Sequence, residues 1–169
     1  MSIQTLNKKR IVLGVDPGFE RVGLAIIEKD GFKKEKIIYS TCVITKKTDH
    51  FNERLKIIGD TLKDVIKKYK PKEVAIEKLF FTTNQKTVMG VSEVRGACLY
   101  IAISNKLIIG EYTPLQIKIA MTGYGRADKK DVLKMVEKLI DIPKEIKRLD
   151  DEIDAIAIAL THIAHTKFV

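Results

Sequence analysis

The order in which hydrophobic patterns follow one another constrains the fold of this chain more than any other feature. Three short apolar runs rich in β-branched residues come first and predict a three-stranded antiparallel meander. They occupy residues 10–16, 21–28 and 36–45. Pro17-Gly18 marks a tight turn between the first two runs. From Phe51 the apolar residues instead recur every three or four positions, which predicts a helix that ends before Pro71.

Helices and strands alternate over the rest of the chain. We expect strands at 73–77 and 107–112, a helix at about 85–104, short helices opened by Thr113 and Asp128, and a last helix from about 150. This order predicts an α/β fold, in which a mixed sheet of three antiparallel and two parallel strands carries helices on both faces. Because no repeat or flexible linker divides the chain, we expect a single domain over 1–169, with 1–10 as a flexible N-terminal extension.

Length and composition exclude several classes of protein. No run approaches the roughly 20 apolar residues of a membrane helix, and the N-terminus lacks an apolar signal region, so we expect a cytoplasmic protein without a membrane partner. Cys42 and Cys98 have no His or Cys at ligand spacing and are expected to be reduced core thiols. The net charge of +9 favours a polyanionic partner such as nucleic acid, although surface lysines can also serve solubility alone.

Four acidic residues stand where predicted elements begin or end. Asp16 follows an apolar run, Glu77 ends the fourth strand, and Asp151 and Asp154 are one turn apart at the start of the last helix. Sites collect at the carboxyl ends of parallel strands, where a divalent cation would relieve the repulsion between these carboxylates. Two Mg²⁺ ions about 3.5–4 Å apart would support hydrolysis of a phosphodiester.

Each of these acidic residues also has an ordinary interpretation. Asp16 precedes Pro-Gly and could be a turn residue, Glu77 could pair only with Lys78, and acidic residues suit the first turn of a helix. Their combination within a chain of net positive charge favours the metal site.

Three segments, GVDPGFERVG, AIEKLFFTTN and DEIDAIAIALTH, resemble the signature segments of the RuvC family, the bacterial Holliday-junction resolvases of the ribonuclease H-like superfamily. The resemblance runs from Ile11 to about His165. It implies a ribonuclease H-like fold, a homodimer, and the RuvA–RuvB branch-migration complex as a partner. The implied activity is resolution of four-way DNA junctions in recombination and repair, by symmetric nicking of two strands that leaves 5′-phosphate and 3′-hydroxyl ends.

The resemblance also implies roles for particular residues. Asp16, Glu77, Asp151 and Asp154 match the catalytic, metal-binding carboxylates, and some members carry His at the position of Asp151. Two Mg²⁺ ions per active site are implied, with Mn²⁺ able to substitute. Because no residue suggests a covalent nucleophile, metal-bound water is expected to attack.

Residues that contact DNA are implied in the same way. Phe80 matches an aromatic residue that stacks on bases near the crossover, although a core phenylalanine would fit this sequence as well. Lys118 and Lys129 match basic residues close to the cleaved strand. Arg126 and Lys130 match less closely and could be ordinary surface residues.

Two further points stay open. A ribonuclease H-like nuclease that processes precursor ribosomal RNA would share the Asp-x-Gly hairpin, and a catalytically silent junction-binding protein would share the basic charge. His162, in the apolar last helix, is expected to be packed rather than catalytic. The expected dimer contact is the helix at 85–104, which carries several small residues. These are Gly90, Ser92, Gly96 and Ala97.

Overall fold

Five strands form one mixed sheet in a computed structural model, which describes residues 9–79, 85–142 and 148–166. The strand order is β3-β2-β1-β4-β5, with β1–β2 and β2–β3 antiparallel and β4 and β5 parallel to β1. The strands are β1 (Lys9–Asp16), β2 (Arg21–Asp30), β3 (Lys36–Ile44), β4 (Glu73–Glu77) and β5 (Ile108–Tyr112). The predicted sheet is confirmed. Lys9, assigned from the sequence to a flexible extension, instead belongs to β1 because it pairs with Asp30 of β2. Arg10, predicted both at the end of that extension and at the start of the first strand, is a strand residue paired with Lys29.

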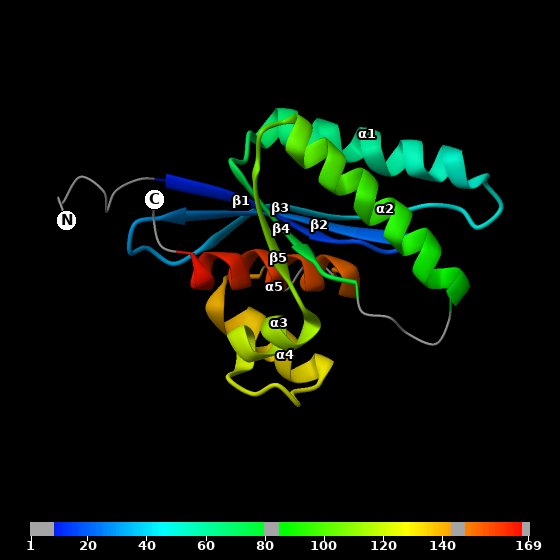
Figure 1. Cartoon of the computed structure of the whole chain (residues 1–169). Coiled ribbons are helices and arrows are strands. Elements are labelled where there is room, and N and C mark those ends of the chain that lie inside the picture. Colours follow the sequence, from blue (N-terminus) through cyan, green and yellow to red (C-terminus); the bar gives the residue numbers. More distant parts are fainter. Residues whose placement is uncertain (1–8, 80–84, 143–147, 167–169) are drawn as a thin grey trace.

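Helices cover both faces of the sheet (Figure 1). Helices α1 (Phe51–Tyr69) and α2 (Gln85–Ser104) lie on one face, and α3 (Pro114–Thr122), α4 (Lys129–Leu139) and α5 (Asp150–His165) lie on the other. Strand alternation divides the core accordingly, since alternate residues of a strand point to opposite faces. In β1, Leu13 packs in the cluster under α1 and α2, and Val12 packs in the cluster under α5. None of the described helices is both long and apolar enough to cross a membrane.

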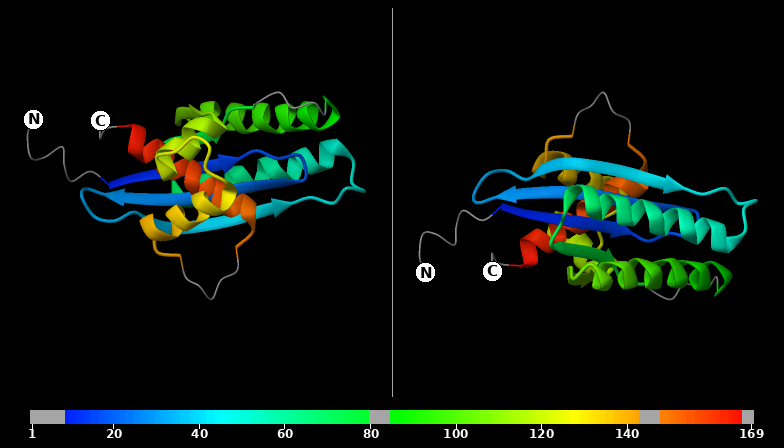
Figure 2. Two further views of the ribbon diagram at one scale, coloured as in Figure 1. Left: turned by 90° about the horizontal axis from the view of Figure 1, so that it is seen from below. Right: turned by 90° about the horizontal axis from the view of Figure 1, so that it is seen from above.

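Two glycines allow α5 to approach the sheet closely. A Cβ at Gly14 would lie 2.0 Å from the carbonyl oxygen of Ala155, and a Cβ at Gly23 would lie 1.9 Å from that of Asp151. Figure 2 shows α5 running obliquely across the strands. The two glycines therefore fix the depth at which the first turn of α5 sits.

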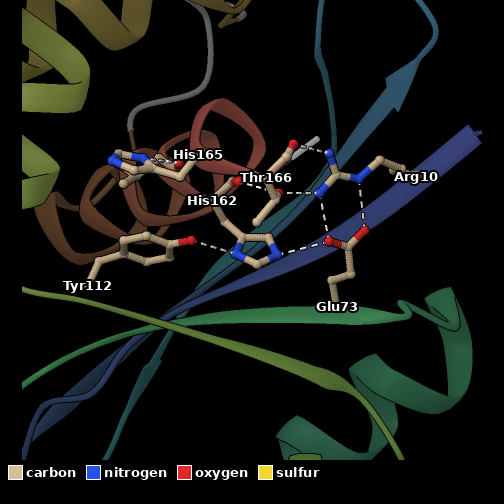
Figure 3. A network of polar contacts seen from close by, with 7 residues as sticks. Arg10, Glu73, Tyr112, His162, His165 and Thr166 are labelled. Carbon is tan, nitrogen blue, oxygen red and sulfur yellow. Dashed lines mark hydrogen bonds and ion pairs between the residues drawn. The ribbon is translucent and has the colours of Figure 1, made fainter. Parts of the chain in front are cut away.

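A buried polar network lies toward the other end of α5 (Figure 3). His162 is 2% exposed, with Nδ1 2.8 Å from the Tyr112 hydroxyl and Nε2 2.9 Å from Oε2 of Glu73. Arg10 pairs with Glu73 and donates a hydrogen bond to the carbonyl oxygen of Thr166. Burial opposes ionisation of Glu73, but hydrogen bonds from His162 and Arg10 lower its pKa to about 2. His162 is therefore a packed residue, as predicted.

Candidate active site

Two acidic side chains come from neighbouring parallel strands. In the pairing of β1 with β4, Val15 lies opposite Ile76, so Asp16 and Glu77 follow at the same edge of the sheet. The residues before them are apolar and buried, whereas Asp16 and Glu77 are half-buried. Side chains at this edge can face a ligand while their strands stay in the core.

Two more acidic side chains come from the first turn of α5, where Asp151 and Asp154 are one turn apart. Oδ2 of Asp151 accepts a hydrogen bond from Cys42 at 3.7 Å and lies 3.6 Å from Nη1 of Arg21. Cys42 is therefore a half-buried thiol beside the acidic residues. The expectation of a core thiol was wrong for Cys42 and holds for Cys98, which is 3% exposed.

Burial and neighbouring acidic charges raise the pKa of three of these carboxylates. Burial, followed by the charges of Glu77, Asp154 and Asp151, raises the pKa of Asp16 to about 8. Burial and the charge of Asp154 raise the pKa of Glu77 to about 7. Burial also raises the pKa of Asp154, against the opposing effect of Lys129. The structure thus brings together Asp16, Glu77, Asp151 and Asp154 in one acidic cluster.

Lys129 is a second cation, besides Arg21, that contacts this cluster. It stands in the first turn of α4, which Asp128 opens with a capping box that includes Asp131. Its Nζ lies 2.8 Å from Oδ2 of Asp154 and 3.6 Å from Oδ2 of Asp150. The ammonium group therefore neutralises part of the charge of the cluster.

The chemistry of the acidic cluster fits a divalent cation. As the side chains lie, no three His, Cys, Asp or Glu side chains among the described residues are close enough to hold a metal ion. However, carboxylate oxygens are the donors that Mg²⁺ prefers, and burial together with the charges of the neighbouring carboxylates raises the pKa of Asp16, so a cation at this edge would relieve the repulsion.

A cleft of about 210 Å³ opens beside the acidic cluster. One wall is apolar and comes from α3, α4 and α5, and the polar wall carries two acidic and two basic side chains. The lining residues are Glu77, Pro114, Ile117, Lys118, Lys129, Val132, Asp154, Ala157 and Ile158. A ligand in the cleft would therefore meet both positively and negatively charged side chains.

The other predicted DNA-contacting residues are placed as follows. Lys118 on α3 lines the cleft, whereas Arg126 and Lys130 are exposed around the start of α4. Phe80 lies outside the described residues.

Sequence reasoning missed three residues that contact the acidic residues. Arg21 and Cys42 contact Asp151, and Nε of Arg95 in α2 donates to the backbone carbonyl of Glu77 at 3.0 Å. Of these three residues, only Arg21 could have been found from the sequence, because it lies in the segment GVDPGFERVG just after the turn that follows Asp16.

This mixed sheet with acidic residues at the ends of β1 and β4 and the start of α5 defines a ribonuclease H-like nuclease. The model of the family described as crossover junction endodeoxyribonuclease RuvC matches residues 12–162. The chain belongs to the RuvC family of crossover junction endodeoxyribonucleases, which are metal-dependent nucleases.

Relatives match over most of their length. The crossover junction endodeoxyribonuclease RuvC of Fusobacterium nucleatum is 44% identical over 152 residues, which cover 90% of this chain and 79% of the relative. That of Halothermothrix orenii is 45% identical over 152 residues, which cover 90% and 91%.

Solved structures agree with this assignment. Thermus thermophilus RuvC in complex with Holliday junction substrate has a TM-score of 0.86 and 30% identity, and the match covers 92% of this chain and 94% of that chain. The yeast mitochondrial Holliday junction resolvase Ydc2 shares the fold, with a TM-score of 0.68, 13% identity, and coverage of 90% of this chain and 77% of that chain.

Proposed function

We propose that this protein resolves four-way DNA junctions by hydrolysing one phosphodiester in each of two opposed strands, leaving 5′-phosphate and 3′-hydroxyl ends. The observation that carries the proposal is the cluster of Asp16, Glu77, Asp151 and Asp154 at one edge of a RuvC-family sheet. A catalytically silent binding protein would have no use for three carboxylates, those of Asp16, Glu77 and Asp154, whose burial and neighbouring charges oppose their ionisation.

We propose that the four carboxylates hold Mg²⁺, with two ions in each active site, and that Mn²⁺ can substitute because it accepts the same oxygen donors. When bound, the ions supply the Lewis acidity for displacement at phosphorus. Asp16 and Glu77 offer their oxygens from the strand ends, and Asp151 and Asp154 offer theirs from α5. Both helix-borne carboxylates already have other contacts, Asp151 with Arg21 and Cys42 and Asp154 with Lys129.

The basic residues around the cleft are proposed to hold the DNA backbone. Lys118 and Lys129 line the cleft, where each can position a phosphate beside the carboxylates. Arg126 and Lys130 are exposed nearby and would contact phosphates farther along the strand. Phe80, three residues after Glu77, is proposed to stack on an unpaired base near the crossover.

Two symmetric cuts need two active sites at a fixed spacing, which a two-fold homodimer supplies. We propose that the dimer forms through the outer face of α2. This face exposes Met89, Tyr100 and Ile103 by 66%, 73% and 62%, and a Cβ at Gly96 would meet nothing within 4 Å. Gly90 is not part of this face, because it is buried against Phe19 of the same chain.

The wider setting of the reaction is proposed from the family and its substrate. We propose one nuclease domain over residues 1–169, action in the cytoplasm where bacterial DNA is held, and cooperation with the RuvA–RuvB branch-migration complex.

One assay tests the proposed function. Purified protein is incubated with Mg²⁺ and with end-labelled four-way junction, linear duplex or precursor ribosomal RNA, and Asp16→Asn serves as a control that should bind the junction without cutting it. Paired nicks in the junction alone support the proposal. Cleavage of the RNA, or junction binding without any cleavage, would overturn it in favour of one of the two alternatives.

A further inference from the structure

Phe19 lies in the turn between β1 and β2, three residues after Asp16, and the proposed chemistry gives it no role. Its ring stacks on Phe51, the first residue of α1, with ring centroids 5.7 Å apart and an angle of 12° between the planes. Cζ of Arg54, one turn farther along α1, lies 4.1 Å from the centroid of the Phe19 ring. A cation over an aromatic face is an attractive contact that strengthens with burial.

Arg54 also holds the backbone of the same turn. Its side chain is unusual for an arginine, because the residue is only 4% exposed. Nη2 donates to the carbonyl oxygen of Phe19 at 2.6 Å, and Nε donates to Oγ1 of Thr45 at 2.9 Å. The backbone N–H of Thr45 in turn donates to the carbonyl oxygen of Glu20 at 3.0 Å. The buried guanidinium of Arg54 thus holds the turn in two ways, by a hydrogen bond to the backbone of Phe19 and by contact with the Phe19 ring.

Helix α2 closes the other side of the Phe19 ring. A Cβ at Gly90 would lie 2.1 Å from Cδ2 and 2.4 Å from Cε2 of Phe19, so the ring rests directly on the backbone of α2. A side chain at position 90 would have to displace the ring. The ring cannot move toward α1 instead, because Phe51 and Arg54 already occupy that side.

We propose that Phe19 is a positioning residue, which sits between Gly90 of α2 and Arg54 of α1 and thereby holds Asp16 beside Glu77. The same helix α2 holds the end of β4 through the hydrogen bond from Arg95 to the carbonyl of Glu77. The spacing of the two strand-borne carboxylates is therefore set from α2. This inference rests on the proposed role of Asp16 as a metal ligand.

Gly90→Ala tests the contact with a single added methyl group. The dissociation constant of Mn²⁺ is measured by calorimetry on the full-length protein without DNA. The Mg²⁺ concentration that gives half-maximal junction cleavage is measured as well. Residues that orient a metal ligand typically change metal affinity by about tenfold or more, so we expect the dissociation constant and the half-maximal Mg²⁺ concentration each to rise by about tenfold. Junction affinity in EDTA and the dimer, measured by gel shift and sedimentation, should stay as in the wild type.

Gly59→Ala is the control, since it makes the same change in helix α1, where the added Cβ would lie at the ordinary distance of 3.4 Å from Cδ1 of Ile101 and outside the proposed dimer face. It should leave Mn²⁺ affinity unchanged. A Gly90→Ala protein that folds and binds Mn²⁺ as tightly as Gly59→Ala would overturn the proposal. If Gly90→Ala does not fold, Phe19→Leu is measured instead, and unchanged Mn²⁺ affinity in that variant would overturn it equally.

A double variant shows whether the effect passes through the ring. Phe19→Ala should weaken Mn²⁺ binding, and adding Gly90→Ala to it should weaken binding no further, because the obstructing ring is gone. Additive losses would contradict a role for Phe19.

Asp16→Asn separates this inference from the proposed function, because a normal Mn²⁺ affinity in that variant would refute the metal site itself. Loss of Mn²⁺ binding in Asp16→Asn with unaffected Phe19 and Gly90 variants would refute only the positioning role.

Discussion

Asp16 keeps its carboxyl group in surroundings that favour the protonated form. Burial and three nearby acidic residues raise the pKa of Asp16 to about 8, and burial with Asp154 raises that of Glu77 to about 7. A free carboxylate at either position therefore opposes folding, whereas a bound cation would relieve the repulsion. The ionised carboxylates of Asp16 and Glu77 therefore lower the stability of the metal-free protein, whereas the proposed metal binding requires them.

Asp16→Asn should stabilise the metal-free protein and abolish cleavage. The change removes the charge and one proposed metal ligand but keeps the shape of the side chain. We expect a gain of about 1–3 kcal/mol in the free energy of unfolding at pH 8, measured by urea denaturation in EDTA. A loss of stability would show that the carboxylate is well accommodated without metal. Retained cleavage in Mg²⁺ would remove Asp16 from the site.

The same pKa shifts predict how the metal-free protein responds to pH. Because the folded protein holds the protons of Asp16 and Glu77 up to a pH of about 8 and about 7, it binds more protons than the unfolded chain above pH 4. The stability contributed by these two groups should therefore fall as pH rises from about 4 to about 8. Thermal unfolding in EDTA across this range, compared with Asp16→Asn, measures the effect. An equal pH dependence in the two proteins would contradict the shift.

At the scale of helices and strands, local signals could be predicted from the sequence and distant contacts could not. Thr113 and Asp128 both cap helices as expected, because a cap depends only on residues three positions away. The placement of Asp16 and Glu77 followed from where two apolar runs end. The contact of Cys42 with Asp151 depends instead on how closely α5 packs on β2, to which the sequence gives no local signal.

Gly23→Ala should displace the first turn of α5. The added Cβ would lie 1.9 Å from the carbonyl oxygen of Asp151, and backbone atoms cannot rotate away as a side chain can. Overpacking of this kind costs about 1–3 kcal/mol in stability, and it should also slow cleavage because Asp151 and Asp154 move together. Urea denaturation and single-turnover cleavage measure the two effects. Gly59→Ala, whose Cβ would lie 3.4 Å from Cδ1 of Ile101 and outside the proposed dimer face, is the control and should neither lower stability nor slow cleavage.

The network at the other end of α5 should contribute stability and not catalysis. The pKa of Glu73 is lowered to about 2, so its ion pair stabilises the protein above pH 4.5 and is lost as pH falls from 4.5 through about 2. Glu73→Gln should destabilise the protein by about 1–2 kcal/mol at pH 7, a value reduced by partial solvent screening. The difference should vanish near pH 2, and cleavage per folded molecule should stay unchanged. Unfolding at pH 7 and at acid pH, with a cleavage assay, tests both statements.

The molecule as a whole combines an acidic cluster with a net charge of +9. Affinity for a junction should therefore fall steeply with salt, with a log–log slope of about −0.9 for each phosphate neutralised on duplex DNA.

Because Lys118 and Lys129 line the cleft beside the carboxylates, their replacement by Ala should slow cleavage more than it weakens binding. Gel shifts over a range of salt and single-turnover cleavage distinguish these effects. A change confined to the salt slope would make both lysines ordinary phosphate contacts.

Helix α5 supplies two of the four acidic residues and is also the last helix of the described fold. Ribosomes release the chain from its N-terminus, so Asp16 and Glu77 emerge well before Asp151 and Asp154. Until α5 reaches β1 and β2, the apolar face that it covers is exposed and only two of the four proposed metal ligands are in place. With the ligands proposed here, the active site of a newly made chain would therefore form only when α5 closes the core.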